Sequence, residues 1–478
     1  MSGPFANFVY APTLAVRVGV RFGAVYLFTR LLTPEGYGRY SLLLTAVAVT
    51  QTVLFSWIEA ALFRMYARAA KNGWLGDLRA SLCGPAAVLA GPVCLAVAVV
   101  PFLPQFGESR RALAAGAGLL LTSFASNLRR EALRAQGRSG RYTAIDAAGK
   151  LGGLTIGVAL AWRYDWGAAA PLAGPAFATV LVLLTDLLWE RLKRGGELGL
   201  GRPRPAIRRA AVAYGVPLAL SLGAEALLTS GDRFVIAAFL GESDVGAYAA
   251  GYGLAAQGIG MTFTCAGLAA APLAIEAFER HGAEAARRSA EKFVRVLLFL
   301  GVPAAVGLCV VAEPLADFAV GEKLAGDAAV VIRWISPAAL LAGLFSQYFT
   351  LSFALTRRTG TQAALTATAA GLNLGLNVLL IPSFDLIGAI AATNLAYAFA
   401  LAAAAIAGRR RLALPFPIGY AARCGTAAAA MAAVLLLAPW PSFISPLAET
   451  ALRVAAGGTV YLLCAVPLGL APTIGSNR

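Results

Sequence analysis

Charged residues inside long apolar runs are the features of this sequence best suited to chemistry. Arg17 and Arg21 lie four residues apart in the first such run, so a helix would place both side chains on one face. If that helix crosses a membrane, each charge at mid-depth costs roughly 2.5 to 3.5 kcal/mol, so neither arginine should face lipid. A guanidinium presents a planar fork of donors that matches phosphate oxygens. We therefore expect the two arginines either to line a cavity and bind an anionic ligand or to form a structural ion pair between helices.

Asp146 and Lys150 are a second pair of charges in an apolar run. Their i to i+4 spacing suits a salt bridge on one face of a helix. Such a bridge would reduce the cost of holding Lys150 below the lipid headgroups. We interpret the pair as structural neutralisation and keep a role in ion coupling as the alternative.

The other reactive residue types form no pattern typical of a catalytic or metal site. The lone histidine, His281, falls in a hydrophilic loop among arginines, and no nucleophile, metal-ligand or phosphate-loop motif occurs. The six cysteines are scattered singly, without the C-x-x-C spacing of a zinc site. The longest loop has about 20 residues and lacks a pair of acids. We expect a protein that is not an enzyme and that holds no cofactor and no metal.

The composition indicates that lipid is the solvent for most of the chain. Hydrophobic residues make up 59% of the 478 positions and charged residues 13%, and the mean hydropathy is +0.71. A bilayer core requires about 20 mostly apolar residues per helix, with every backbone group satisfied internally. The first apolar run contains Arg17 and Arg21 and has no basic lead, so we expect a retained span rather than a signal peptide.

Apolar runs of spanning length predict about fourteen membrane helices and an all-α polytopic membrane protein. The run at 245–275 is longer than a bilayer requires, and we expect it to continue into the cytoplasm. The predicted spans are 8–30, 40–63, 82–103, 112–128, 142–162, 168–190, 210–230, 245–275, 293–313, 329–355, 362–383, 386–408, 418–439 and 450–472.

Every second loop between these spans is rich in arginine and lysine. The residues around 64–79, 129–141, 191–209, 280–295, 357–358 and 409–411 form the basic set. By the positive-inside rule these loops and both termini face the cytoplasm, and we expect a bacterial cytoplasmic membrane. The net charge of +16 is then a signal of topology and of contact with anionic membrane lipids, rather than of nucleic-acid binding.

A hairpin sequence occurs twice and predicts an internal repeat. "LLTPEGYGRYSLLL" matches "FLGESDVGAYAAGY" without a gap, so that Gly38 aligns with Gly246 and Tyr40 with Tyr248. An even number of crossings separates the two copies, so both hairpins point to the same side. We expect two lobes of six helices, residues 1–200 and 205–410, related by a pseudo-twofold axis along the membrane normal. The last two helices, in residues 411–478, stand outside the repeat.

Glu225 falls at the position of Arg17 when the second repeat is superposed on the first. Facing Arg17 across the pseudo-twofold axis, it could pair with the arginine in one state and separate in another, or carry a proton inside the cavity. The simpler interpretation is that Glu225 only neutralises Arg17. Both interpretations place it on the cavity wall with Arg17 and Arg21.

Three segments, taken in order, resemble one family. The first hairpin, the second hairpin in "GDRFVIAAFLGESDVGAYAAGY", and "AAGLNLGLNVLLIPSFDLIGAIAATNLAYAF" are similar to polysaccharide biosynthesis (O-antigen flippase-like) membrane proteins. That family is part of the multidrug/oligosaccharidyl-lipid/polysaccharide exporter superfamily. The third segment departs from the family pattern, because Phe384 and Asp385 replace the glycine that usually follows the proline.

The resemblance implies a flippase that moves a polyprenyl-pyrophosphate-linked oligosaccharide by alternating access, for surface polysaccharides such as the O-antigen of lipopolysaccharide. Its partners would be the glycolipid, membrane lipids and other polysaccharide-assembly proteins. The alternative within the superfamily is a multidrug or organic-cation antiporter, but two arginines in the first helix favour an anionic cargo. A membrane glycosyltransferase would require a larger loop with catalytic groups, and a structural scaffold would not explain paired charges at mid-membrane.

Overall fold

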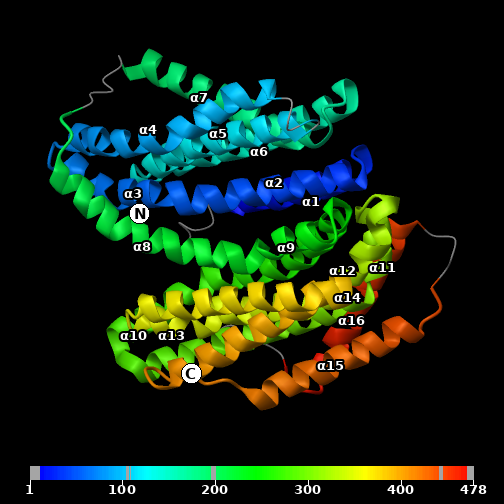
Figure 1. Ribbon diagram of the computed structural model, residues 1–478. Helices are drawn as coiled ribbons and strands as arrows, with labels where there is room; N and C mark the ends of the chain where they lie inside the picture. Colours follow the sequence, from blue (N-terminus) through cyan, green and yellow to red (C-terminus); the bar gives the residue numbers. More distant parts are fainter. Residues whose placement is uncertain (1–10, 104–106, 108, 195–200, 441–444, 471–478) are drawn as a thin grey trace. The chain divides into compact units, whose positions relative to one another are not determined.

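The computed structural model describes residues 11–103, 107, 109–194, 201–440 and 445–470, and throughout this part of the chain the regular elements are helices (Figure 1). The predicted all-α fold is confirmed. The start of the predicted span 8–30, residues 195–200 of the predicted linker and the end of the span 450–472 lie outside the described residues. The chain divides into two compact units, Met1–Phe234 and Val235–Arg478.

The first unit is built from long helices in chain order. The hairpin that opens it turns where Thr33 caps α2, its side chain accepting a hydrogen bond from the Gly36 amide at 3.1 Å, and Pro34 occupies the first helical turn. The helices are α1 (Ala11–Leu31), α2 (Pro34–Thr50), η2 (Gln51–Phe55), α3 (Ser56–Lys71), α4 (Leu75–Val99), α5 (Ser109–Ala135), α6 (Ser139–Tyr164), α7 (Ala170–Arg194) and α8 (Pro205–Ser230).

Helices α2, η2 and α3 form one continuous rod, in which η2 is a π-helical segment. The core of the first unit lies against this rod and includes Phe55, Trp57 and Ile58. Helix α8 packs on it closely, because a Cβ atom at Gly215 would lie only 2.5 Å from the Trp57 carbonyl oxygen. Although the sequence assigns α8 to the second repeat, it therefore packs on α3 within the first compact unit.

The described end of the predicted linker is anchored to the start of α4. The Arg202 amide donates to Asp77 Oδ1 at 2.8 Å, and Arg204 Nη2 lies 2.5 Å from Asp77 Oδ2. Ser81 Oγ accepts a hydrogen bond from the Arg204 amide at 2.9 Å. The entry of the chain into α8 is thereby fixed on another helix of the same unit.

The second unit contains two long helices, each of which is divided by a kink. Helix α10 has non-helical backbone at Gly282 (φ 78°), and α14 has it at Asp385 (φ 50°). The second kink falls between the predicted spans 362–383 and 386–408. The helices are α9 (Asp232–Phe239), which begins in the first unit, α10 (Glu242–Val310), α11 (Ala312–Ala319), α12 (Glu322–Leu344), η6 (Phe345–Phe349), α13 (Leu351–Leu355), α14 (Thr359–Arg409), α15 (Ile418–Leu437) and α16 (Pro446–Ala465).

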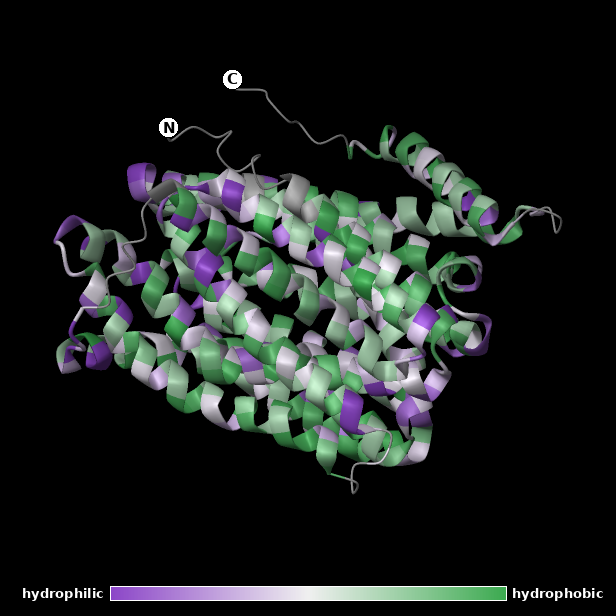
Figure 2. Cartoon of the chain, turned by 90° about the horizontal axis from the view of Figure 1, so that it is seen from above, coloured by the Kyte–Doolittle hydropathy of each residue, from purple (hydrophilic) through white to green (hydrophobic). Residues whose placement is uncertain are grey.

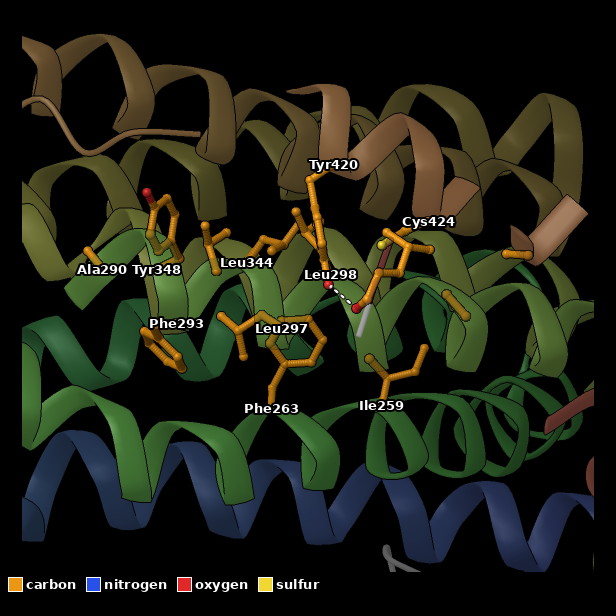
Figure 3. Packing of buried hydrophobic residues seen from close by; sticks show 14 of the residues in the cluster. Ile259, Phe263, Ala290, Phe293, Leu297, Leu298, Leu344, Tyr348, Tyr420 and Cys424 are labelled. Carbon is orange, nitrogen blue, oxygen red and sulfur yellow. Dashed lines mark hydrogen bonds between the residues drawn. The ribbon is translucent and has the colours of Figure 1, made fainter. Parts of the chain in front are cut away.

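The core of the second unit joins α10 to α12, η6 and α15. Figure 3 shows Phe263, Phe293 and Leu297 of α10 beside Tyr348 of η6 and Cys424 of α15. Met431 and Tyr461 extend the same core to α15 and α16. The two helices outside the predicted repeat therefore pack on the second unit through their own apolar faces.

Ten helices in the described residues are long and apolar enough to cross a membrane, with α10 and α14 each taken as one helix despite the kink. Helices α1 and α5 are not among these ten. Hydrophobic residues cover most of the helix length, and hydrophilic residues gather towards the helix ends (Figure 2). The chain is thus a polytopic α-helical membrane protein, whereas the number of fourteen crossings and the symmetry of the lobes stay predictions.

Candidate functional site

Asp146 on α6 is the centre of a buried charge cluster in the first unit. Its side chain is 1% exposed, and cations from three helices contact it. Arg17 Nε of α1 lies 2.9 Å from Oδ2, and Lys150 Nζ of α6 lies 3.7 Å from Oδ1. Arg130 Nη1 of α5 also donates to Oδ1. One carboxylate therefore holds α1, α5 and α6 together.

Tyr142 and Lys150 flank Asp146 on the same face of α6, one helical turn to either side. The Tyr142 hydroxyl accepts a hydrogen bond from Arg17 Nη2 at 3.2 Å, so Arg17 bridges two successive turns of α6. About two turns farther along α6, helix α7 packs closely against it, because a Cβ atom at Gly153 of α6 would lie 2.8 Å from Pro175 Cα of α7. The face of α6 that carries Tyr142, Asp146 and Lys150 thus has a fixed orientation.

Arg130 connects this cluster to a second carboxylate, that of Glu59, which is partly buried. Its Nη2 donates to Oδ1 of Asn127, one turn earlier on α5. Asn127 Nδ2 in turn donates to Glu59 Oε1 at 3.1 Å, and Gln51 Nε2 donates to the same oxygen at 2.6 Å. A continuous polar chain therefore runs from Asp146 through Arg130 and Asn127 to Glu59.

The exposed part of the cluster is cationic. The side chains of Arg17 and Lys150 are 38% and 36% exposed, and Arg21, one turn after Arg17, is exposed as well. No ion pair joins Arg21 to another described residue. Asp146, in contrast, is buried beneath the arginines. An anion that approached this face would meet guanidinium and ammonium donors before it met a carboxylate.

Of the residues predicted from sequence to form a site, the structure brings Arg17, Asp146 and Lys150 into contact, with Arg21 beside them. Glu225 lies on α8 with an exposed side chain and has no ion pair among the described residues. In this structure the carboxylate partner of Arg17 is Asp146. The predicted Asp146 and Lys150 pair is part of a larger cluster rather than an isolated bridge.

Sequence reasoning missed Arg130, Asn127, Tyr142 and Glu59. We expected a helix over 112–128 and placed Arg130 in the basic loop that follows, but α5 continues to Ala135 and keeps Arg130 inside the helix. The signal was the i to i+3 spacing of Asn127 and Arg130, which places both on one helix face. Tyr142 could have been found by its spacing of one turn from Asp146.

A separate ion-pair network joins the C-terminal parts of α5 and α7 to the N-terminal end of α6. Arg129 Nε lies 2.7 Å from Asp186 Oδ2, and Arg141 Nε lies 2.5 Å from Asp186 Oδ1. Glu190 pairs with Arg129 as well. Arg138 Nη1 also lies 3.8 Å from Glu190 Oε1, so three arginines share the two acids of α7, and these ion pairs brace the helices.

Among the described residues, no group of three or more histidines, cysteines, aspartates or glutamates is arranged to hold a metal ion. The six cysteines are free thiols.

Comparisons with known proteins agree with the fold. The sequence pattern of a family described as "Polysaccharide biosynthesis protein" matches residues 27–326. No curated protein sequence matches the chain. Among solved structures, a lipid II flippase MurJ in an inward closed conformation is similar, with a TM-score of 0.76 and 13% identity, over 97% of this chain and 98% of that one.

Two transporter structures are similar over a smaller share of the chain. An inward-facing multidrug resistance MATE family transporter of the MOP superfamily has a TM-score of 0.63 and 16% identity, over 86% of this chain and 95% of that one. A MOP superfamily transporter from Pyrococcus furiosus, described as having a binding pocket of reverse polarity, has a TM-score of 0.58 and 15% identity, over 86% and 98%. At these identities the likeness shows a shared fold.

Proposed function

This chain belongs to the polysaccharide biosynthesis protein family, and on that premise we propose that it is a flippase for a polyprenyl-pyrophosphate-linked oligosaccharide. The polyprenyl tail stays in the bilayer while the polar head crosses the membrane between the predicted lobes. Translocation proceeds by alternating access, and no covalent bond is made or broken. The cargo is a precursor of a surface polysaccharide such as the O-antigen of lipopolysaccharide.

The observation that carries this proposal is the cationic face formed by Arg17, Arg21, Arg130 and Lys150 around one buried carboxylate. A pyrophosphate group supplies several oxygens in the geometry that guanidinium forks recognise. Charges inside membrane helices are costly unless they face a polar cavity or a partner. Arg21 is exposed and has no ion-pair partner among the described residues, which supports our assignment of Arg21 to a water-filled cavity that receives an anion.

The same observation disfavours a multidrug or organic-cation antiporter, which shares the fold. A site for organic cations would require an excess of acidic and aromatic side chains, whereas here the central acid, Asp146, is buried and the cations Arg17 and Lys150 are partly exposed. Glu225 is an exposed acid on α8, and we assign it to the wall of the same cavity, either to counter the arginines in another state or to carry a proton.

The proposal places the protein in a bacterial cytoplasmic membrane with both termini in the cytoplasm, alongside other proteins of polysaccharide assembly. Cells that lack the protein should lose the surface polysaccharide and accumulate the lipid-linked oligosaccharide. Extraction and mass spectrometry of the glycolipids measure this directly. An unchanged glycolipid pool together with greater sensitivity to organic cations would instead assign the chain to the antiporters.

Complementation of such cells links the phenotype to the site. The variant Arg17→Gln/Arg21→Gln should be inserted normally, because removal of charge makes insertion easier, but should fail to restore export. Arg30→Gln is the matched control on the same helix, since Arg30 lies at the end of α1, where its Nη1 donates to the Tyr26 carbonyl at 2.9 Å. If the double variant restored export as well as Arg30→Gln does, the cationic face would not be the cargo site.

A further inference from the structure

We infer that Asp146 is an internal counter-anion, which occupies the phosphate position of Arg17 and Arg130 in the empty site and gives way to the anionic group of the cargo. The inference rests on the proposed function for the identity of that cargo. It concerns a residue that does not itself bind the cargo but sets how tightly the arginines bind it.

The two arginines contact different oxygens of the same carboxylate. Arg17 Nε donates to Oδ2 at 2.9 Å, and Arg130 Nη1 donates to Oδ1. Two guanidinium groups that converge from α1 and α5 on adjacent oxygens also have the arrangement needed to hold two oxygens of a phosphate. The carboxylate therefore lies where the cargo's phosphate would receive its strongest hydrogen bonds.

Asp146 keeps a partner when the arginines turn away from it. Lys150 is on the same helix, one turn later, and its Nζ lies 3.7 Å from Oδ1. Arg17 and Arg130 come from other helices and reach Asp146 through long, flexible side chains. An arginine can thus rotate towards a ligand while the Asp146 and Lys150 pair stays intact, which avoids an uncompensated buried charge.

The charges around Asp146 leave room for a second anion. Arg17, Arg130 and Lys150 bring three positive charges to one carboxylate, and Arg21 adds a fourth on the exposed side. Glu59, the nearest other acid in the polar chain, is reached only through the Asn127 amide. A pyrophosphate carries more charge than a carboxylate and offers more acceptor oxygens, so it competes successfully for the arginines.

The physical benefit of a competing carboxylate is release of the cargo. Transport requires binding that is strong enough to load the site and weak enough to empty it. Without Asp146, the arginines would keep only the neutral acceptors Tyr142 and Asn127 and would have no internal anion to return to, so the phosphate would leave slowly. Asp146 therefore lowers the affinity of the arginines for the cargo and speeds the release of the cargo.

Binding of inorganic pyrophosphate to the purified full-length protein tests the inference separately from flipping. Calorimetric titration should show that Asp146→Asn binds pyrophosphate about tenfold or more tightly than the parent, because the arginines then leave a neutral amide oxygen rather than a charged carboxylate. In cells the same variant should export polysaccharide more slowly. The matched control is Asp165→Asn, at the exposed end of the same helix, where Asn also tolerates the left-handed backbone (φ 49°).

Asp146→Asn/Lys150→Gln is a second variant, which preserves the net charge of α6 if the single change prevents folding. It should still bind pyrophosphate more tightly than Lys150→Gln alone. If the folded Asp146 variants bind pyrophosphate equally or more weakly than their references, the inference is overturned. It is also overturned if neither the single nor the double Asp146 variant inserts into the membrane, because Asp146 would then be required for the structure itself. Tighter pyrophosphate binding without any effect on glycolipid pools would support the counter-anion and contradict the proposed cargo.

Discussion

Arg17 on α1 and Asp146 on α6 are separated by 129 residues of sequence, yet Arg17 Nε lies 2.9 Å from Asp146 Oδ2. The contact joins the first helix of the unit to a helix far along the chain. Because Asp146 also accepts from Arg130 of α5, the same carboxylate fixes three helices. Arg17 thus links helices in addition to the cargo-binding role that we propose for it, and variants of Arg17 must separate these two roles.

Replacing Arg17 by Lys and by Gln separates the effect of its positive charge from the effect of its two-pronged hydrogen bonding. Lys retains a point charge that attracts phosphate but loses the two-pronged contact, so we expect partial export. Gln loses both, and export should fall roughly 10- to 100-fold, the range expected for loss of a hydrogen bond between charged groups. Surface polysaccharide per cell, normalised to the amount of protein in the membrane, measures both variants. Equal export by the Lys and Gln variants would argue that Arg17 does not contact the cargo.

Glu225→Gln tests whether Glu225 is the counter-charge of Arg17. Since Arg17 pairs with Asp146 in this structure, the double variant Arg17→Gln/Glu225→Gln should export no better than Arg17→Gln. The export of the two single variants and the double variant, compared as a cycle, gives the coupling between the positions. Recovery in the double variant would show that Arg17 meets Glu225 in another conformational state and that neutralising Glu225 is what matters.

Several parts of the site could be predicted from sequence because they depend on local spacing. Arg17 and Arg21, and likewise Asp146 and Lys150, share helix faces through the i to i+4 rule, and the depth of each in an apolar run marks it as functional or paired. These features require only one helix at a time.

The rest of the site depends on how helices pack, which spacing within one helix does not determine. Arg130 meets Asp146, and Asn127 meets Glu59, only because α5 lies against both α6 and the rod formed by α2 and α3. The end of α5 was also misplaced, because a run of arginines favours a loop by hydropathy while the same residues are good helix formers. Ion pairs with acids on α6 and α7 hold Arg130 and Arg129 within the helix.

Gly215→Ala should destabilise the protein through the contact between α8 and α3. The added Cβ would lie 2.5 Å from the Trp57 carbonyl oxygen and 2.8 Å from Trp57 Cβ, and backbone atoms cannot yield as side chains do. Overpacking of this kind costs roughly 1 to 3 kcal/mol, which thermal unfolding in detergent will reveal as a lower midpoint. Gly118→Ala is the control, because a Cβ there meets nothing within 4 Å, and its midpoint should stay equal or rise.

The predicted topology can be tested with reporter fusions at two positions. A fusion after Gly195 should be cytoplasmic and a fusion after Lys323 should be on the outer side, because basic loops alternate with acidic ones along the sequence. Alkaline phosphatase activity and fluorescence of a cytoplasmic reporter give opposite signals at the two sides. Equal signals at both positions would contradict the predicted number of crossings between them.

Asp385→Gly should stabilise the kink that divides α14. Asp385 has φ 50° and ψ −137°, a backbone conformation that suits glycine and costs of order 1 to 3 kcal/mol for other residues. Asp385 also lines one pocket with Asp244 and Asp327, so loss of its charge relieves repulsion as well. Asp385→Asn removes the charge but keeps the Cβ atom, and it should gain less stability than Asp385→Gly.

Gly388→Ala should have the opposite effect, because its Cβ would lie 2.5 Å from the Leu380 carbonyl oxygen across the kink. Thermal unfolding midpoints of the three variants therefore should rank Asp385→Gly first and Gly388→Ala last, and a lower midpoint for Asp385→Gly than for the parent would show that the carboxylate has a stabilising partner at the kink.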